Sequence, residues 1–251
     1  MISVCMATYN GEKYIKEQLK SILKQLGPCD EIIISDDGSK DNTKDVIDSI
    51  DDKRIHYYVN SGTHGFTHNF ENALHRARGD FVFLSDQDDL WMDNKVSTVM
   101  NALKTADFVT HDCITVDAQM KVISESRFND FNVKPGFLNH LIKSRYLGCC
   151  MAFNRKILDA SLPFPENDFL VEHDIWIAAV AFLYFKSNVL REPLIYYRRH
   201  GNNVSDGGFT KGYSAKVKIQ KRAYRILKLL QAYPRVNKVK SRRYDLQKQY
   251  Q

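Results

Sequence analysis

Short apolar runs that alternate with helix-like segments constrain the fold of the first 110 residues. Three of these runs, at residues 2–7, 31–35 and 81–85, consist largely of β-prone residues, which is typical of strands buried on both faces. A further short strand is expected at residues 54–59. The intervening segments have apolar side chains at the helical period, and they predict helices at residues 12–26, 41–50 and 65–77. This alternation indicates βαβ units and a largely parallel sheet, which is an α/β fold.

Polar or acidic residues follow three of these strands at the point where each strand ends. They are Thr8 and Asn10, Asp36 and Asp37, and Asp86, Asp88 and Asp89. In an open parallel sheet ligands bind at the carboxyl ends of the strands, so these side chains are expected along one edge. The carboxylates within residues 86–89 would repel one another, and a divalent cation that prefers oxygen ligands is the simplest compensation. The sequence therefore predicts a metal site after the strand at residues 81–85.

The second half of the chain mixes shorter elements. We expect helices at residues 93–103, 135–143 and 175–185, strands at 107–110, 147–153 and 189–199, a hairpin at 114–124 and a loop at 164–170. No Gly-x-Gly-x-x-Gly or Walker pattern follows the first strand, which disfavours a dinucleotide fold or a P-loop. The ligand is therefore expected to be held by acids, a metal and backbone groups.

Charge is divided unevenly along the chain. From Lys211 to the end there are 13 Lys and Arg and one acid, whereas the first 210 residues carry 23 basic and 29 acidic groups. The five cysteines show no Cys-x-x-Cys spacing, which favours reduced thiols in a cytoplasmic protein. The chain begins directly with a strand-like segment, so no signal peptide is expected. The longest near-apolar run, residues 175–185, is too short to span a bilayer.

Six short motifs then occur in a recognisable order and spacing. They occupy residues 6–11, 36–39, 84–91, 148–154, 173–176 and 197–203. In this order the chain resembles the inverting family 2 glycosyltransferases, which have the GT-A fold. Its Ser-Asp-Gln-Asp-Asp-x-Trp and Tyr-Arg-x-His-x-x-Asn forms are similar to those of a bacterial rhamnosyltransferase-like subgroup that builds surface polysaccharides.

The resemblance implies how the chain is organised. A GT-A catalytic domain is expected at residues 1–206, with a mostly parallel central sheet flanked by helices. Within it, residues 1–110 would bind the nucleotide sugar and residues 111–206 the acceptor. Residues 207–251 would form a basic amphipathic helical tail.

A metal site at the acidic stretch is the first functional implication of the resemblance. Mn²⁺ or Mg²⁺ would be held there and would bridge the diphosphate of a nucleotide sugar. Asp88 is the expected direct ligand, and Asp86 would contact the metal, its bound water or the ribose. His200 would complete the site from the far end of the domain. The alternative for the acids is a solvated turn that caps the helix from Asp93, and Trp91 is expected to pack rather than to stack on a ligand.

Further donor contacts are implied at the ends of the first two strands. Asp37 would accept a hydrogen bond from a pyrimidine base, with Asp36 as the rival reader or as a helix cap. The loop that lies against base and ribose is matched by Thr8, Tyr9 and Asn10, and simple turn chemistry is the alternative for it. Arg198 is expected to assist the diphosphate.

Asp174 matches the catalytic base of the family. Inversion needs one carboxylate that takes the proton of the acceptor hydroxyl as its oxygen attacks the anomeric carbon. Glu172 is the rival base, and an N-cap of the helix at 175–185 is the structural alternative for Asp174. The expected acceptor contacts are Glu172, His173, Trp176, Gly148 and Cys149. A structural role is an equal alternative for His173, and packing alone would explain the thiol of Cys149.

Residues 214–233 predict an amphipathic helix. Its apolar stripe comprises Ile219, Ala223, Ile226, Leu227, Leu230 and Tyr233, and its other face carries Lys218, Lys221, Arg222, Arg225 and Lys228. Two interpretations stay open: the helix lies on an anionic membrane surface, or it docks on the acidic catalytic body. Nucleic-acid binding is disfavoured, because no motif and little aromatic interleaving accompany the charge.

The expected function is metal-dependent, inverting transfer of a sugar from a UDP- or dTDP-sugar to a hydroxyl of a growing surface glycan, such as O-antigen or capsule. The acceptors of the family are often lipid-linked. Nucleotidylyl transfer is the alternative reaction, but it usually needs a glycine-rich basic loop, which residues 10–12 do not supply. A non-catalytic nucleotide-binding module is the other alternative, and the intact Asp88, Asp174 and His200 argue against it. The protein is expected in the cytoplasm, or peripherally on the inner face of the plasma membrane if the tail binds lipid.

Overall fold

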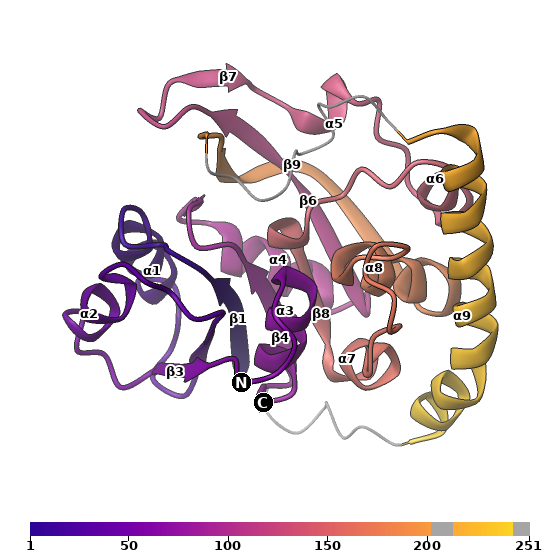
Figure 1. Ribbon diagram of the computed structural model, residues 1–251, viewed down its shortest axis with the longest axis horizontal. Helices are drawn as coiled ribbons and strands as arrows, with labels where there is room; N and C mark the ends of the chain where they lie inside the picture. The colour runs from indigo at the N-terminus through magenta and orange to yellow at the C-terminus, as the bar shows by residue number, and fades with distance from the viewer. Residues whose placement is uncertain (202–212, 243–251) are drawn as a thin grey trace.

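A mixed sheet runs through the centre of the protein (Figure 1). The computed structural model describes residues 1–201 and 213–242. Within them nine strands form one sheet in the order β3-β2-β1-β4-β8-β6-β9-β5, with β7 paired to β6. The strands are β1 (Ile2–Thr8), β2 (Glu31–Asp36), β3 (Ile55–Val59), β4 (Phe81–Ser85), β5 (Leu90–Trp91), β6 (Phe108–Val116), β7 (Val122–Ser124), β8 (Met151–Asn154) and β9 (Ser187–Arg198). The helices are α1 (Ile15–Leu23), α2 (Thr43–Asp48), α3 (Phe66–Leu74), α4 (Lys95–Leu103), α5 (Arg127–Asp130), α6 (Phe137–Ile142), α7 (Arg155–Ser161), α8 (His173–Tyr184) and α9 (Ala215–Ser241), and Gly148–Cys150 forms the 3-10 turn η1.

The first four strands form the parallel half that the sequence predicts. β1 pairs in parallel with both β2 and β4, and β3 pairs in parallel with β2. Thr8 at the end of β1 lies in register with Asp36 at the end of β2. The carboxyl ends of these strands, and the polar residues that follow them, therefore meet at one edge of the sheet, as expected.

The second half of the sheet is mixed rather than mostly parallel. β8 is antiparallel to both β4 and β6, whereas β9 is parallel to β6 and antiparallel to β5. The strand expected at residues 147–153 begins as η1 and becomes extended only at Met151. The strand expected at 107–110 continues to Val116 and forms the first arm of the hairpin with β7. The short elements α5, α7 and β5 were not predicted, because four to seven residues are too few to establish a period and β5 has only two.

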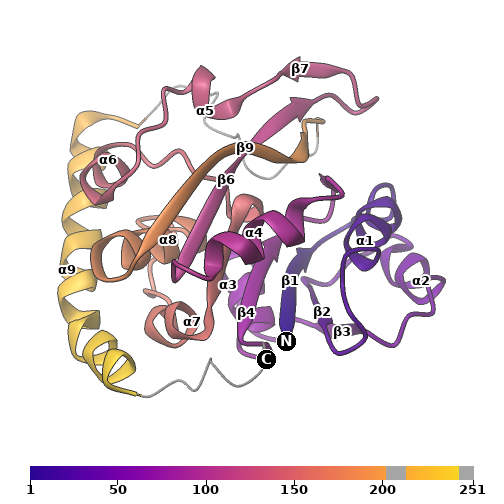
Figure 2. The same ribbon diagram turned by 180° about the vertical axis from the view of Figure 1, so that it is seen from behind.

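Helices cover both faces of the sheet, and the strand residues alternate between two apolar clusters. Cys5, Val82 and Leu84 pack on the side of α3, α7 and α8, whereas Val4 and Met6 pack on the side of α1, α2 and α4. Figure 2 shows α4 lying across the second of these faces. Burial on both faces explains why the strands are near-continuous apolar runs instead of alternating ones.

The C-terminal helix α9 packs along one side of the molecule, against α7 and α8 (Figure 1). It confirms the helix expected at 214–233 and extends it beyond Pro234 to Ser241. Its buried apolar row is Leu229, Ala232, Val236 and Val239. The stripe expected from the sequence lies on the opposite side and is exposed, because this second row at helical spacing makes the docking contact. Among the described residues, no helix has both the length and the hydropathy that crossing a membrane requires.

Candidate active site

Gln87 connects the loop after β1 to the acidic loop after β4 through hydrogen bonds. Its Oε1 accepts hydrogen bonds from Thr8 Oγ1 at 2.5 Å and from the Tyr9 amide at 3.0 Å, and its Nε2 donates to the Tyr9 carbonyl at 3.0 Å. A Cβ on Gly11 would lie 2.3 Å from this Oε1, so any other residue here would displace the Gln87 amide. Thr8 and Tyr9 are thus brought to the acids, as expected. No role for Gln87 was predicted, and its only sequence signal is an amide placed between carboxylates.

Asp36 and Asp37 have different surroundings at the end of β2. Asp36 accepts hydrogen bonds from the amides of Gly38 and Ser39 and from Ser39 Oγ, at 2.6–2.9 Å. Its carboxylate therefore shapes the turn, which is a structural role but not the helix cap that was the alternative. Asn10 is held in the same turn, since its amide donates to Ser39 Oγ at 2.8 Å.

Asp37 lies one residue further along and joins a second loop to the site. Its Oδ1 contacts Asn60 Nδ2 at 2.9 Å and His64 Nδ1 at 3.0 Å, and its Oδ2 accepts the amide hydrogen of Gly65 at 2.8 Å. Neither Asn60 nor His64 was singled out in the sequence. Base recognition by Asp37 stays a prediction, and the carboxylate would have to share its oxygens between the loop and the base.

The structure brings Asp86, Asp88 and His200 together, as the sequence predicts. His200 Nε2 lies 2.8 Å from Asp88 Oδ2, and Asp88 is 9% exposed. Oxygens of Asp86 and Asp89 and the Cys149 Sγ all lie within 4.8 Å of one another. The fully buried Asp89 accepts the Arg198 amide hydrogen at Oδ1, at 3.1 Å, while its Oδ2 has no hydrogen-bond partner among the described residues.

Burial and mutual repulsion perturb these acids. Burial, and then the charge of Asp88, raise the pKa of Asp86 to about 7. Burial, together with the charges of Asp88 and Asp86, raises the pKa of Asp89 well above its ordinary value. Such a cluster fits a divalent cation, because the cation would supply both the missing partner of Asp89 and the opposite charge.

Lys95 is the buried cation behind the acids. Its ammonium donates to the Cys149 carbonyl at 2.8 Å and lies 4.0 Å from the centre of the Trp91 ring. Burial lowers the pKa of Lys95 to about 8, and Asp89 and Asp86 oppose that shift. Trp91 also packs on Phe83, which confirms the packing role expected for it. Lys95 was missed because its distance from Cys149 in the sequence gives no signal.

Arg198 lies beside the acids but is already engaged. Its Nη2 pairs with Glu17 at 2.7 Å, and its guanidinium lies 4.6 Å from the centre of the Tyr14 ring. The same Tyr14 ring stacks on His200. Arg198 therefore supports the position of His200 and, through its amide, of Asp89. A direct contact with the diphosphate stays a prediction that competes with the Glu17 ion pair.

Glu172, His173 and Asp174 begin α8 on the acceptor side. Glu172 occupies the N-cap position, so Asp174 lies in the first turn rather than at the cap. Burial raises the pKa of Asp174 to about 6, with Arg225 and Arg127 acting in the opposite direction. Burial, and then the charge of Asp174, raise the pKa of Glu172 to about 7. The charge of Asp174 also raises the pKa of Asp86, so the predicted donor and acceptor halves of the site interact electrostatically.

His173 is buried between Phe70, which stacks on it, and the edge of Phe66. Neither of its ring nitrogens has a hydrogen-bond partner among the described residues. Burial lowers its pKa to about 3, so the ring is neutral at ordinary pH. A Cβ on Gly148 would lie 3.1 Å from His173 Nε2. Gly148 thus lies close against His173 and Asp174.

The structure does not support Trp176 as an acceptor contact, and it buries Cys149 fully beside Asp86 and Asp89. The Trp176 indole is 1% exposed and donates to the Ser161 carbonyl at 2.8 Å, in the core beneath α8. Asp174 and Trp176 are two residues apart on a helix, so their side chains point in different directions. The last two residues of the motif at 197–203 and the boundary at 206 lie outside the described residues.

Known proteins of similar sequence point to one family. The family model for glycosyl transferase family 2 matches residues 3–162. An uncharacterized glycosyltransferase of Nostoc sp. is 28% identical over 234 residues, covering 86% of this chain and 70% of that protein. The Escherichia coli UDP-Glc:alpha-D-GlcNAc-diphosphoundecaprenol beta-1,3-glucosyltransferase WfgD is 26% identical over 182 residues, covering 71% of this chain and 69% of that protein.

Solved structures show the same fold. Staphylococcus aureus TarS, residues 1–349 in complex with UDP-GlcNAc, superposes with a TM-score of 0.69 at 20% identity, covering 95% of this chain and 71% of that chain. This chain covers 60% of that chain in another structure of the same TarS region. The GT-A fold expected from the sequence is thereby confirmed, and the family match spans more than half of the residues. The chain belongs to glycosyl transferase family 2.

Proposed function

We propose that this protein is a metal-dependent, inverting glycosyltransferase that moves a sugar from a UDP- or dTDP-sugar to a hydroxyl of a growing surface glycan. One observation carries the proposal. The Asp88–His200 pair lies at the carboxyl end of β4, and the perturbed carboxylate of Asp174 lies within electrostatic range of the neighbouring Asp86. A diphosphate site and a proton acceptor at one sheet edge are the two parts that sugar transfer requires.

Asp86, Asp88 and His200 are the residues that would hold Mn²⁺ or Mg²⁺. When bound, the cation neutralises the charge that develops on the leaving diphosphate. The buried Asp89 and Lys95 keep this loop in place through the Arg198 amide and the Cys149 carbonyl. Gln87 holds the β1 loop, with the exposed ring of Tyr9, against the same acids. The mannosyltransferase of Pyrobaculum calidifontis solved with GDP-Man and Mn²⁺ has the same fold, with a TM-score of 0.58 at 20% identity.

Asp174 would remove the proton of the acceptor hydroxyl. With a pKa of about 6, its carboxylate is largely ionised at neutral pH yet more basic than an ordinary aspartate. Glu172 is the rival base, and its higher pKa of about 7 leaves it partly protonated under the same conditions. The neutral ring of His173 and the bare backbone of Gly148 border the space in which the acceptor sugar would lie.

The relatives guide the choice of substrates. WfgD and a Campylobacter jejuni relative, which is 38% identical over 102 residues, are both named as glucosyltransferases that act on undecaprenol-linked glycans. We therefore propose a lipid-linked glycan as acceptor and UDP-glucose as the first donor to test. The rhamnosyltransferase-like motifs add dTDP-rhamnose as the second donor. An enzyme with such an acceptor would work in the cytoplasm, at the inner face of the plasma membrane.

A donor screen tests the function. Thermal stability would be measured with UDP- and dTDP-sugars in the presence of Mn²⁺, and a donor at 100 times its Kd should stabilise the protein by about 2.7 kcal/mol. Release of nucleoside diphosphate would then be followed with Asp88→Ala and Asp174→Asn. Sugar transfer predicts metal-dependent release that both substitutions abolish. Release of pyrophosphate from a nucleoside triphosphate would instead identify a nucleotidylyltransferase. Donor binding without any product would identify a non-catalytic module.

A further inference from the structure

The outward side of α9 carries an uninterrupted apolar row. It consists of Ile219, Ala223, Ile226, Leu227, Leu230 and Tyr233, all exposed, and Leu230 is 65% exposed. The opposite side of the same helix already packs on the body through Leu229, Val236 and Val239. Docking of α9 therefore does not explain the outward row, which costs solvation free energy unless something covers it.

The neighbouring helix α6 adds further exposed apolar residues to this row. Leu138 and Ile142 of α6 are 70% and 63% exposed. Two arginines of α9 bind the end of α6, since Arg222 donates to the Ile142 carbonyl at 2.7 Å and Arg225 to the His140 carbonyl at 3.2 Å. The two helices therefore present one surface. We call the exposed apolar residues of both helices, Leu138, Ile142, Ile219, Ile226, Leu227, Leu230 and Tyr233, the α6–α9 surface.

Two aromatic rings lie close to this surface near the start of α9. Phe169 and Tyr213 are both about half exposed and meet edge to face, 5.9 Å apart. The ammonium of Lys221 lies over both rings, at 4.9 Å from Phe169 and 4.3 Å from Tyr213. Exposed aromatic rings beside a lysine are a common arrangement at the polar boundary of a bilayer.

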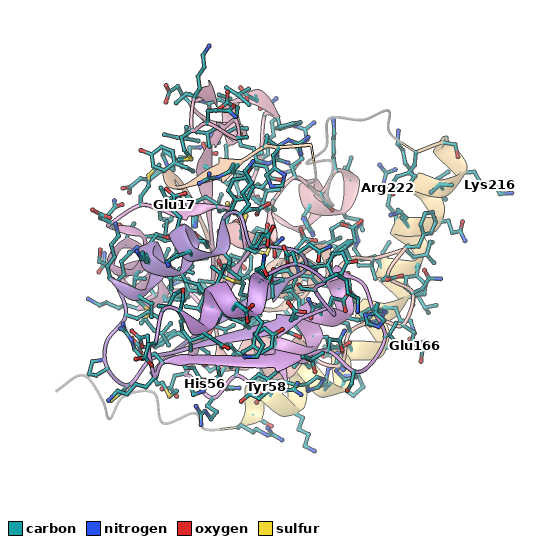
Figure 3. All side chains as sticks on the ribbon, turned by 60° about the vertical axis from the view of Figure 1, so that its left-hand side comes forward. Glu17, His56, Tyr58, Glu166, Lys216 and Arg222 are labelled. Atoms are coloured by element: carbon teal, nitrogen blue, oxygen red, sulfur yellow. The ribbon has the colours of Figure 1, made fainter. Side chains whose placement is uncertain are left out.

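The charge that α9 itself carries has a single sign. α9 contains nine Lys and Arg and no Asp or Glu, whereas the first 210 residues carry an excess of acids. Lys216 and Lys218 near its start and Lys238 and Lys240 near its end are exposed. In Figure 3, Lys216 and Arg222 lie on the opposite side of the molecule from Glu17 of α1. A second copy of the chain would fit this surface poorly, because pairing two such helices would bring like charges together.

The surface also has a defined relation to the proposed base. Arg225, on the inner side of α9, donates to the His140 carbonyl of α6. Burial lowers the pKa of Arg225 to about 10, and the charges of Asp174 and Glu172 oppose that shift. The Tyr224 hydroxyl accepts the amide hydrogen of Asn167, in the segment that leads to Glu172. The helix that bears the outward apolar row therefore also supports the acceptor half of the site.

We propose that the α6–α9 surface docks on the anionic phospholipid surface of a membrane and there holds the acceptor half of the enzyme beside its lipid-linked substrate. The apolar row would insert at the boundary between headgroups and acyl chains, and the lysines would pair with lipid phosphates. The docking itself depends only on the surface, whereas its use in presenting an acceptor rests on the function proposed above.

Flotation of the full chain with lipid vesicles tests the docking. Vesicles of phosphatidylcholine alone would be compared with vesicles that contain phosphatidylglycerol, at low and at high salt. We expect binding to the anionic vesicles, at least about tenfold weaker binding to the neutral ones, and weakening by salt.

Leu227→Ser with Leu230→Ser should lower the affinity about tenfold, since the two side chains would no longer be buried in lipid. Lys216→Glu with Lys218→Glu should do so as well.

Matched controls keep the test decisive. Val122→Ser with Ile123→Ser removes two exposed apolar side chains from β7, and Lys53→Glu with Lys104→Glu reverses two exposed charges elsewhere. These variants should bind vesicles like the unsubstituted chain, and far-ultraviolet circular dichroism would verify that every variant is folded. Equal binding of all variants, or absence of binding to anionic vesicles, would overturn the proposal. A dimer that Leu227→Ser with Leu230→Ser disrupts, without vesicle binding, would assign the surface to a second copy instead.

The proposed sugar transfer and the proposed membrane docking can be contradicted independently of each other. Sugar transfer to a soluble acceptor analogue does not require a membrane, so the α9 double variants should keep that activity. If transfer is absent but anionic vesicles bind, the docking stands without the function proposed for it. If transfer is present but vesicles do not bind, only the docking is wrong.

Discussion

His200 Nε2 lies 2.8 Å from Asp88 Oδ2, although the two residues are 112 positions apart in the chain. The pairing of β9 with β5 brings them together, since Leu90 is in register with Tyr196. Asp88 shortly precedes β5, and His200 shortly follows β9. The two-residue strand β5 therefore determines where the predicted metal ligands from both ends of the domain meet.

Removal of the Asp88 carboxylate should abolish metal activation. We expect Asp88→Ala to lower kcat by about 100-fold or more, because a preorganised charge at the leaving group is lost. His200→Ala should instead raise the concentration of Mn²⁺ needed for half-maximal activity, with a smaller fall in kcat. Steady-state rates measured over a range of Mn²⁺ concentrations would separate the two effects.

Asp93→Ala is the matched control for this experiment. Asp93 follows the same acidic loop, but its side chain is 85% exposed and pairs with Lys24. Its removal should leave metal activation unchanged. An Asp88→Ala enzyme with full Mn²⁺-dependent activity would contradict the metal assignment.

Asp174 should make both activity and stability depend on pH. Activity should rise as the pH passes about 6, because the ionised carboxylate is the proton acceptor. The contribution of Asp174 to stability changes with pH in the opposite direction. Burial raises the folded-state pKa from 3.8 to about 6, so the contribution of Asp174 to stability is full below pH 3.8 and is lost as the pH rises through 6.

Asp174→Asn should therefore stabilise the protein at pH 8 while it abolishes transfer. The expected gain is roughly 1–3 kcal/mol at pH 8 and near zero at pH 4, since the neutral amide avoids the cost of a buried charge. Thermal unfolding of both proteins across this pH range would measure it. A constant difference in Tm at every pH would show that Asp174 is not the group with the raised pKa.

Arg225 should tune the proposed base from the C-terminal helix. The charged groups that act on Asp174 or its neighbour Glu172 are Glu172 itself, Arg127 from α5, Arg225 and Lys221 from α9, Asp86 just after β4, and Asp168. Arg225→Met should shift the acidic limb of the pH–kcat profile to higher pH, because the charge that favours the Asp174 carboxylate is lost.

Two further variants distinguish this charge effect from a packing effect. Arg225→Lys should restore much of the profile, since it retains the charge. Arg222→Met removes a guanidinium that donates to the Ile142 carbonyl rather than acting on the proposed base, so it should leave the limb in place. If Arg225→Met lowered activity equally at every pH, its role would be structural alone.

Gly148→Ala should impair use of the acceptor more than binding of the donor. The new methyl group would lie 3.1 Å from His173 Nε2 and 3.4 Å from the Asp174 Cβ, in the space assigned to the acceptor sugar. We expect the acceptor KM to rise about tenfold or more, which corresponds to about 1.4 kcal/mol. Kinetics with each substrate varied in turn would show which KM changes.

Gly27→Ala provides the control for the added methyl group. A Cβ there would meet only Asp30 Oδ2, at 3.4 Å, outside the predicted site. Both KM values should stay unchanged. A Gly148→Ala enzyme whose donor KM alone rises would place the donor sugar, not the acceptor, in this space.

The parallel half of the fold could be predicted because its signals are local. Each buried strand is an apolar run, and each ends in the residues that form the site, so Thr8, Asp36 and Asp86 fall on the correct edge. Gln87 and Lys95 could not be found in this way. Their roles depend on which backbone carbonyls and amides the fold brings near them, and residues 79 or 54 positions apart leave no periodic signal.

The orientation of α9 illustrates a different limit. The strongest apolar stripe of its sequence faces outward, and a weaker row that includes Leu229 and Val236 makes the contact with the body. Periodicity identifies that a helix is amphipathic, but it cannot choose between two apolar rows on one helix. Trp176 shows the same limit on α8, where proximity in sequence to Asp174 suggested a ligand contact that burial does not support.

Docking of α9 joins the start of α8 to a part of the chain beyond the family match, which ends at residue 162. Tyr224 of this helix accepts the Asn167 amide hydrogen, and Arg225 donates to the His140 carbonyl and to Ser144 Oγ. In a chimera of two relatives, the C-terminal helix and the acceptor half should therefore come from the same enzyme. A chimera that took the nucleotide half from one enzyme and only residues 111–201 from another would separate a proposed base from the arginine beside it.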